Sequence, residues 1–168
     1  MGLRLSKVVA QICTSPLQVD DFSWFQSRKN SLRLKASDDD SMISISVFGD
    51  GIRFHPRPLS YYYESLPCID AEASGYDALA FTMKAPSDGS ITLEMQTTDD
   101  CSTEAYNSTW RYVVNFTGEA QKIVAPISSF EGAKTNGIAA FNWATWESHN
   151  KDFDWELSDI KLTCNGKA

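Results

Sequence analysis

Residues 43–54 read ISISVFGDGIRF, and this stretch decides the fold that we expect for the chain. Apolar and polar residues largely alternate on both sides of Gly49-Asp50-Gly51. Alternation with a period of two is typical of β-strands, and glycine and aspartate tolerate the positive φ angles of a tight turn. The stretch therefore predicts a β-hairpin with strands at 43–48 and 52–54.

Six further β-rich segments follow the hairpin, separated by turn-forming residues. Patterns with a helical period are scarce and are limited to short turns near residues 15–25 and 127–130. Many short strands with turn signals between them are typical of a sandwich of two sheets. We therefore predict an all-β, jelly-roll β-sandwich of about eight antiparallel strands, the last six at 78–84, 90–96, 109–116, 121–125, 137–143 and 154–162.

The size and charge of the chain limit what it can be. Its 168 residues, 42% of them hydrophobic and 22% charged, indicate one folded domain, which we assign to residues 13–168. We interpret residues 1–12 as an N-terminal extension or the remnant of a signal peptide. No apolar run is long enough to span a bilayer. The formal net charge of -7 argues against nucleic acid and anionic membranes as partners, and we expect a monomer.

Four cysteines, at positions 13, 68, 101 and 164, show no metal-ligand spacing. Their even number suggests two disulfides, for which three connectivities are possible. Because the terminal strands of a sandwich usually lie side by side, we favour Cys13 with Cys164, which leaves Cys68 with Cys101.

The compartment follows from the cysteines and from two N-glycosylation sequons, at Asn107 and Asn115. Disulfides and sequons both favour a secreted protein. The first thirteen residues, MGLRLSKVVAQIC, contain basic residues and a short apolar stretch, but no long hydrophobic region of a signal peptide. Four reduced cysteines in a cytosolic protein, or a truncated start, stay open as alternatives.

Several segments carry a resemblance to a known group of proteins. They are CTSPLQVDDF (13–22), SDDDSM (37–42), SYYYE (60–64), YDALAF (76–81) and TLEMQT (92–97). Over most of its length the chain resembles secreted fungal galactose-binding-like sandwich domains, some of which are associated with polysaccharide deacetylases and glycoside hydrolases. The resemblance implies a galactose-binding-domain-like fold and secretion. It implies carbohydrate binding only through the fold that many carbohydrate-binding modules share.

Aromatic residues gather at 24–25, at 61–63 and along 143–155. The apolar faces of sugar rings stack on Trp and Tyr, so these clusters are candidates for a carbohydrate site. We expect Trp143 and Trp155, inside predicted strands, to lie in the core. We expect Tyr62 and Trp146 to be exposed and to stack on a neutral oligosaccharide or polysaccharide.

Polar groups for such a site come from the alternation in residues 91–96. Ile, Leu and Met alternate there with Thr92, Glu94 and Gln96, which predicts that the polar row faces outward. We expect Glu94, Gln96 and Arg111 to hydrogen-bond the sugar hydroxyls.

Two other classes of function stay open. An enzyme could use a buried carboxylate such as Glu94 or Glu156, although the sequence places no pair of carboxylates together and contains no nucleophile motif. A protein-interaction or cell-wall structural role is the second alternative. We favour a secreted, non-catalytic carbohydrate-binding domain.

Acidic residues lie near both ends of the expected sandwich domain, where its first and last strands are placed: Asp20 and Asp21 near the start and Asp159 near the end. Because these strands are expected to be neighbours, Asp21 and Asp159 are candidates for a structural calcium site. Turn capping by the same aspartates is the simpler interpretation.

Overall fold

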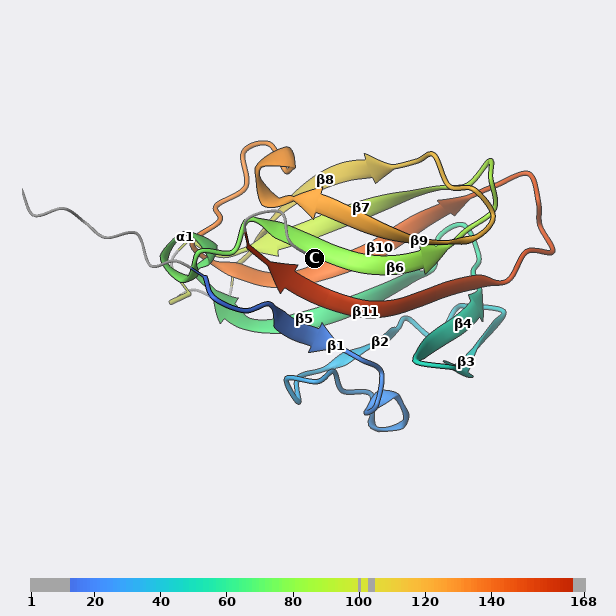
Figure 1. Cartoon of the computed structure of the whole chain (residues 1–168), viewed down its shortest axis with the longest axis horizontal. Helices are drawn as coiled ribbons and strands as arrows, with labels where there is room; N and C mark the ends of the chain where they lie inside the picture. The colour runs from blue at the N-terminus through green and yellow to red at the C-terminus, as the bar shows by residue number, and fades with distance from the viewer. Residues whose placement is uncertain (1–12, 100, 103–104, 165–168) are drawn as a thin grey trace, which may run out of the picture.

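Two antiparallel sheets pack face to face in the computed structural model, which describes residues 13–99, 101–102 and 105–164 (Figure 1). One sheet has the order β3-β4-β11-β6-β9, with β1 also paired to β11, and the other has the order β2-β5-β10-β7-β8. The strands are β1 (Leu17–Asp20), β2 (Ala36–Asp38), β3 (Ser44–Phe48), β4 (Gly51–His55), β5 (Tyr61–Ile69), β6 (Ala78–Lys84), β7 (Ser90–Thr97), β8 (Asn107–Val113), β9 (Ala120–Pro126), β10 (Ile138–Glu147) and β11 (Trp155–Thr163).

The prediction of an all-β jelly-roll sandwich is confirmed. The hairpin at 43–54 forms as expected: Phe48 pairs with Gly51, and Gly49 has a φ angle of 56°. Helical structure in the described residues is limited to α1 (Ala71–Ser74) and the short 3-10 turns η1 (Phe25–Ser27) and η2 (Ile127–Ser129). None of these helices is long and apolar enough to cross a membrane.

Three strands were not predicted, so the described chain has more strands than expected. β1 lies where we expected a helical turn, and β2 lies partly in the acidic block at 37–41. β5 contains Glu64 and Pro67, which interrupt the β-rich pattern. Each of the three pairs with a longer strand, so tertiary packing rather than local pattern forms them.

The core lies between the two sheets. Trp143 and Phe81 meet there edge to face, with ring centroids 5.4 Å apart, and neither is more than 1% exposed. Trp155 is also buried, so the prediction that Trp143 and Trp155 belong to the core is confirmed. These rings face the core, so the side chains on the opposite face of the sheet β2-β5-β10-β7-β8 are not needed to pack the two sheets together.

Both predicted disulfides are present. Cys13 is bonded to Cys164, next to the paired strands β1 and β11, and Cys68 is bonded to Cys101. No cysteine in the described chain is free. The structure therefore contradicts the alternative in which all four cysteines are reduced.

Candidate functional site

A row of side chains crosses the outer face of the sheet β2-β5-β10-β7-β8. Asn142 on β10 is paired with Tyr63 on β5 and with Glu94 on β7, and Glu94 is paired with Trp110 on β8. Residues directly opposite each other in antiparallel strands point to the same face. Four strands therefore place an aromatic ring at each end of the row and polar groups between them.

Two parallel rows flank this central row. They are Tyr61, Ala144, Thr92 and Tyr112 on one side, and Ser65, Ala140, Gln96 and Ser108 on the other. The alanines of β10 are short, so the middle of the sheet is low. The result is a groove of about 640 Å³, to which we refer below as the groove.

The aromatic residues of the groove are accessible. The exposed fraction is 39% for Tyr61 and 52% for Trp110, and it is 76% for Tyr112, which lies beside the groove on the same face. The rings of Tyr61 and Tyr63 lie beside each other, with centroids 6.2 Å apart. These rings can offer flat apolar surface to a ligand from both ends of the groove.

One wall of the groove is the segment 28–40. Both terminal nitrogens of Arg28 donate to the Asp40 carboxylate, at 3.1 and 3.3 Å. The Asp38 carboxylate accepts from the backbone N–H of Asp40, and Lys35 lies 5.9 Å from the centroid of the Tyr63 ring. These bonds order the wall before a ligand arrives, which lowers the entropy cost of binding.

Glu94 is the polar centre of the groove floor and is only 6% exposed. Its Oε1 accepts from Ser108 Oγ at 2.5 Å and from Gln96 Nε2 at 3.4 Å, and its Oε2 accepts from Asn142 Nδ2 at 2.6 Å. Donors on both oxygens compensate for the partial burial of the carboxylate. Glu94 is thus a fixed hydrogen-bond acceptor facing the groove.

The expected positions of Glu94 and Gln96 on the outward row are confirmed, but Arg111 is not part of the groove. It pairs with Leu93, a core residue, and therefore points away from Glu94. Its Nη1 donates to Ser129 Oγ at 2.6 Å. The expectation that Arg111 contacts a ligand beside Glu94 is wrong, because adjacent residues of a strand face opposite sides.

The expectation that Tyr62 and Trp146 are exposed is also wrong. Tyr62 is 1% exposed and lies on the core side of β5, between the outward residues Tyr61 and Tyr63. Trp146 is 4% exposed, its Nε1 donates to the Ser60 carbonyl at 2.7 Å, and its ring packs on Phe54.

The burial of Trp146 has a local cause. Simple alternation from Asn142 would place Trp146 on the groove side. A bulge shifts the register of β10 between Ala144 and Glu147, and Thr145 there has a φ angle of 55°. The extra residue turns Trp146 inward.

Sequence reasoning selected Tyr62 from the 61–63 cluster and did not single out Tyr61, Tyr63 or Trp110, the aromatic residues that line the groove. Tyr112 lies on the same face in the neighbouring row. The signal was available as two pairs of aromatics at i and i+2, one pair on each edge of the face. The two members of such a pair point to the same side of a strand.

The remaining candidate carboxylates lie elsewhere. Glu156 is paired with Arg53, whose Nη2 lies 2.7 Å from Glu156 Oε1, on the other sheet. Glu64 points to the core side of β5, close to Asp20, and neither residue has any exposed surface. Burial raises the pKa of both carboxyl groups, and the Asp20 charge raises that of Glu64 further. The two groups form a buried pair, in which Glu64 holds its proton more tightly than an exposed glutamate does.

Asp21 and Asp159, the candidate calcium ligands, have protein partners. Asp21 Oδ1 accepts from Ser23 and Ser31, and Asp159 Oδ1 lies 3.1 Å from Lys161 Nζ. In the described ranges no group of three or more His, Cys, Asp and Glu side chains is placed to hold a metal ion. The structure gives no support to a calcium site at these residues, which stays a prediction.

Both sequon asparagines are exposed, Asn107 at the start of β8 and Asn115 just after its end. They are accessible to a glycan, and their glycosylation stays a prediction.

Comparisons with known proteins give structural likenesses only, since no protein-family model and no curated protein sequence matches the chain. The structure is similar to the family 11 carbohydrate-binding module of a cellulosomal cellulase from Clostridium thermocellum, with a TM-score of 0.60, 16% identity and coverage of 89% of this chain and 95% of the module. A family 11 carbohydrate-binding module from Clostridium thermocellum in complex with a β-1,3-1,4-mixed-linked tetrasaccharide is also similar, with a TM-score of 0.58 at the same identity and coverage.

A second similar structure is the family 30 carbohydrate-binding module of another Clostridium thermocellum cellulase, with a TM-score of 0.54 and 13% identity. This match covers 79% of this chain and 92% of that module. At such low identities the likeness concerns the fold. The chain therefore has the β-sandwich fold found in these carbohydrate-binding modules.

Proposed function

We propose that this protein is a non-catalytic carbohydrate-binding domain that holds a neutral oligosaccharide or polysaccharide in the groove. The observation that carries the proposal is the row of Tyr63, Asn142, Glu94 and Trp110 across four strands. Sugar rings have apolar C–H faces that stack on aromatic rings and hydroxyl groups that need hydrogen-bond partners. The row offers both, with an aromatic ring at each end and hydrogen-bonding groups between them.

The shape of the groove supports a chain rather than a single sugar. Neighbouring strands are about 4.8 Å apart, so the three spacings from β5 to β8 separate the two aromatic rims by roughly 14 Å. Rings stacked on both rims must belong to different units of one extended ligand. The solved complex of the family 11 module with a tetrasaccharide supports the same ligand class for this fold.

The disulfides and the exposed sequons support the proposal that the domain works outside the cell and is glycosylated. Polysaccharides are met in that environment. That the domain is a monomer stays a prediction. The resemblance to fungal domains associated with polysaccharide deacetylases and glycoside hydrolases fits this location and stays a prediction.

Replacing Trp110 by alanine tests the proposal. A glycan-array screen first identifies a ligand, and calorimetry then compares the parent with Trp110→Ala. We expect the variant to lose about 1 to 3 kcal/mol of binding free energy and to keep its melting temperature within a few degrees, because the ring is half exposed.

Trp24→Ala is the matched control, since Trp24 is also a partly exposed tryptophan but does not line the groove. It should bind as the parent does. A parent that binds no glycan, or a folded Trp110→Ala variant with unchanged affinity, would contradict the proposed function.

A further inference from the structure

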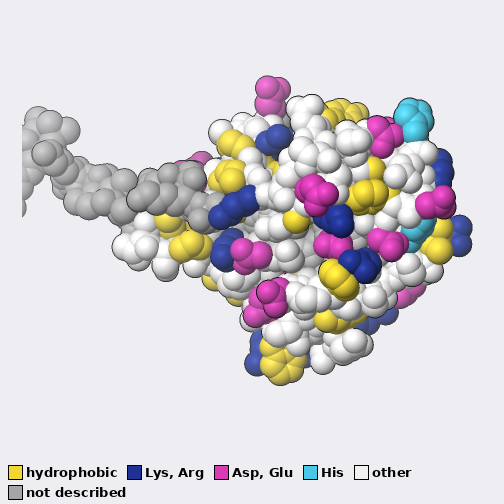
Figure 2. Space-filling view, turned by 45° about the vertical axis from the view of Figure 1, so that its right-hand side comes forward, with side chains coloured by type: hydrophobic (Ala, Val, Ile, Leu, Met, Phe, Trp, Pro, Cys, Tyr) yellow, Lys and Arg dark blue, Asp and Glu magenta, His cyan; other side chains and the backbone are white. Residues whose placement is uncertain are grey.

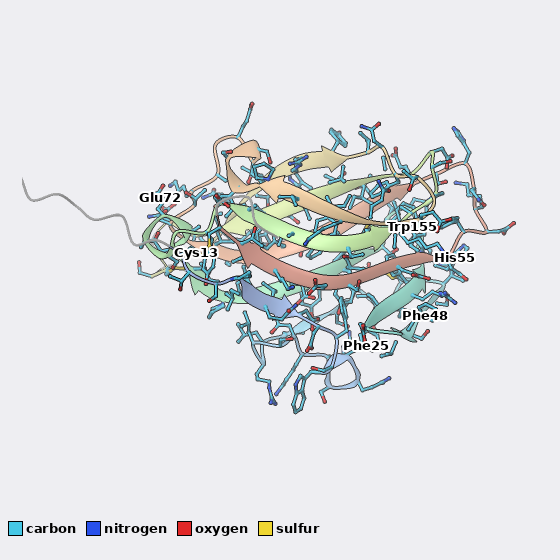
Figure 3. The ribbon with its side chains drawn as sticks, in the orientation of Figure 1. Cys13, Phe25, Phe48, His55, Glu72 and Trp155 are labelled. Carbon is cyan, nitrogen blue, oxygen red and sulfur yellow. A yellow bond between two sulfur atoms is a disulfide. The ribbon has the colours of Figure 1, made fainter. Side chains whose placement is uncertain are left out.

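A second hollow lies at one end of the sandwich and shares no lining residue with the groove. It is bounded by the turn between β4 and β5 and by the loop between β10 and β11, and Trp146 and Trp155 contribute to its wall. Figure 3 places His55 and Trp155 at this end, opposite the end that carries Cys13. The hollow measures about 190 Å³. We refer to it as the end pocket.

The end pocket is basic although the protein as a whole is acidic. Arg57 and Lys151 line it together with His55, and no aspartate or glutamate is among its described lining residues. Figure 2 shows basic side chains, in dark blue, beside the histidines at this end of the molecule. The groove, in contrast, is lined by Glu94 and the acidic segment 38–40.

Asp154 and Asp88 are near the end pocket and have partners in the structure, and Glu147 lies with Asp88 in the adjoining hollow that Lys151 also lines. Asp154 Oδ1 lies 3.7 Å from His55 Nδ1, and its side chain is 56% exposed. Asp88 accepts from Ser148 Oγ and from the backbone N–H of His149, each at 2.6 Å. The charges of Arg57 and Lys151 are therefore not cancelled by a direct ion pair that the structure shows.

The rest of the wall is apolar. Besides the two tryptophans it includes Phe153, Pro56 and Pro58. A small inorganic anion would gain nothing from such a wall, whereas the C–H face of a sugar ring would. At roughly 30 Å³ for each water, the hollow holds the volume of about six waters, which suits one monosaccharide unit.

Both loops that bound the pocket are fixed by hydrogen bonds. Ser60 Oγ donates to the Arg57 carbonyl and accepts from its backbone N–H, and the Ser60 carbonyl accepts from Trp146 Nε1. On the other side, the bonds from Ser148 and His149 to Asp88 hold the β10–β11 loop. The pocket is thus formed before a ligand enters.

We propose that the end pocket is a second binding site, which takes one sugar unit that carries a carboxylate, a uronic acid. Arg57 and Lys151 attract the carboxylate, and the aromatic wall contacts the ring. The site differs in ligand charge from the groove and does not depend on the function proposed for the groove.

A ¹H–¹⁵N NMR titration of the intact, oxidised protein tests this site. The probes are sodium glucuronate, glucose and sodium acetate, and the observed signals are the indole N–H groups of Trp146 and Trp155 and the amides of residues 55–60 and 148–154. We expect glucuronate to shift these signals at millimolar concentration, and glucose and acetate to shift them much less. Raising the salt from roughly 20 to about 500 mM should weaken glucuronate binding several-fold.

Charge-removing variants assign the effect to the pocket. The double variant Arg57→Gln with Lys151→Gln should bind glucuronate about tenfold more weakly, and both side chains are exposed, so the fold should be kept. Lys29→Gln with Lys122→Gln removes the same charge outside the pocket and should bind as the parent does. Trp110→Ala should also keep glucuronate binding, which separates this site from the groove.

Three results would overturn the proposal. They are the absence of glucuronate-induced shifts at the pocket, equal shifts with glucose, and equal shifts with acetate, which would reveal an anion site without sugar recognition. Unchanged affinity of the folded Arg57→Gln, Lys151→Gln variant would overturn it as well.

Discussion

The two faces of the sheet β2-β5-β10-β7-β8 each carry tryptophan, tyrosine and a glutamate that is more than nine-tenths buried, yet they serve opposite purposes. On the inner face, Trp143 and Tyr62 are packed in the core, and Glu64 is fully buried beside the Asp20 carboxyl group. On the outer face, Trp110 is half exposed, and Glu94 accepts from three side chains.

This difference shows that residue type and burial do not by themselves define a site. Glu64 is buried beside a second carboxyl group, which favours its protonated form, and it faces the core. Glu94 is held by three donors on the outer face and presents an acceptor there. Aromatic rings follow the same rule. Their function depends on which side of a strand they occupy.

The largest expected effect separates the two tryptophans. Trp143→Ala should lower the free energy of unfolding by about 3 to 5 kcal/mol, because it leaves a large cavity beside Phe81. Its binding loss should disappear when affinity is corrected for the folded fraction. Urea denaturation and calorimetry on the same sample measure both quantities.

The distinction between the inner and outer faces of the sheet would be wrong if Trp143→Ala weakened ligand binding while its unfolding curve matched the parent's. Trp110→Ala serves as the control on the other face of the sheet.

A smaller effect concerns Glu64 and pH. Burial and the neighbouring Asp20 raise the pKa of Glu64 in the folded state above its unfolded value of about 4.3. The folded protein then binds more protons than the unfolded chain, so stability falls as the pH rises above about 4.3, by at most about 1.4 kcal/mol per pH unit for this group. The stabilisation is complete below the unfolded pKa and is lost towards the folded pKa.

Glu64→Gln should remove that slope. Between pH 4 and neutral pH, the variant should therefore lose less stability than the parent does. Urea unfolding from pH 4 to pH 8 measures the difference between variant and parent, in which titrating groups far from Glu64 cancel and the coupled Asp20 does not. Identical slopes for Glu64→Gln and the parent would show that Glu64 is ionised in the core.

The sequence predicts the fold better than it predicts the groove, for reasons that lie in particular residues. Alternation and turn residues identify the hairpin at 43–54 and the strands from residue 78 onward, because both are local signals. The inward turn of Trp146 depends on the bulge at Thr145. The inward side of Tyr62 depends on β5, a strand that we did not predict.

The proximity of Glu64 and Asp20 could not be predicted either. The two residues are 44 positions apart in the sequence and meet only because β1 and β5 belong to opposite sheets that pack together. By contrast, the outward side of Glu94 and Gln96 follows from the alternation in residues 91–96 alone, and there the prediction is confirmed.

The smallest expected effect tests the role of Glu94 as an acceptor. Glu94→Gln keeps the shape of the side chain but replaces one accepting oxygen by a donating amide, which faces either Asn142 or the pair of Ser108 and Gln96. A sugar hydroxyl that donates to Glu94 then loses a charged partner, and we expect about tenfold weaker glycan binding, or about 1.4 kcal/mol. Calorimetry with the glycan that the parent binds measures it. Asn142→Ala should show a loss of similar size, since it removes a donor that fixes the same carboxylate. If Glu94→Gln binds the glycan as tightly as the parent while Trp110→Ala does not, stacking alone carries recognition and the polar floor only supports the rim.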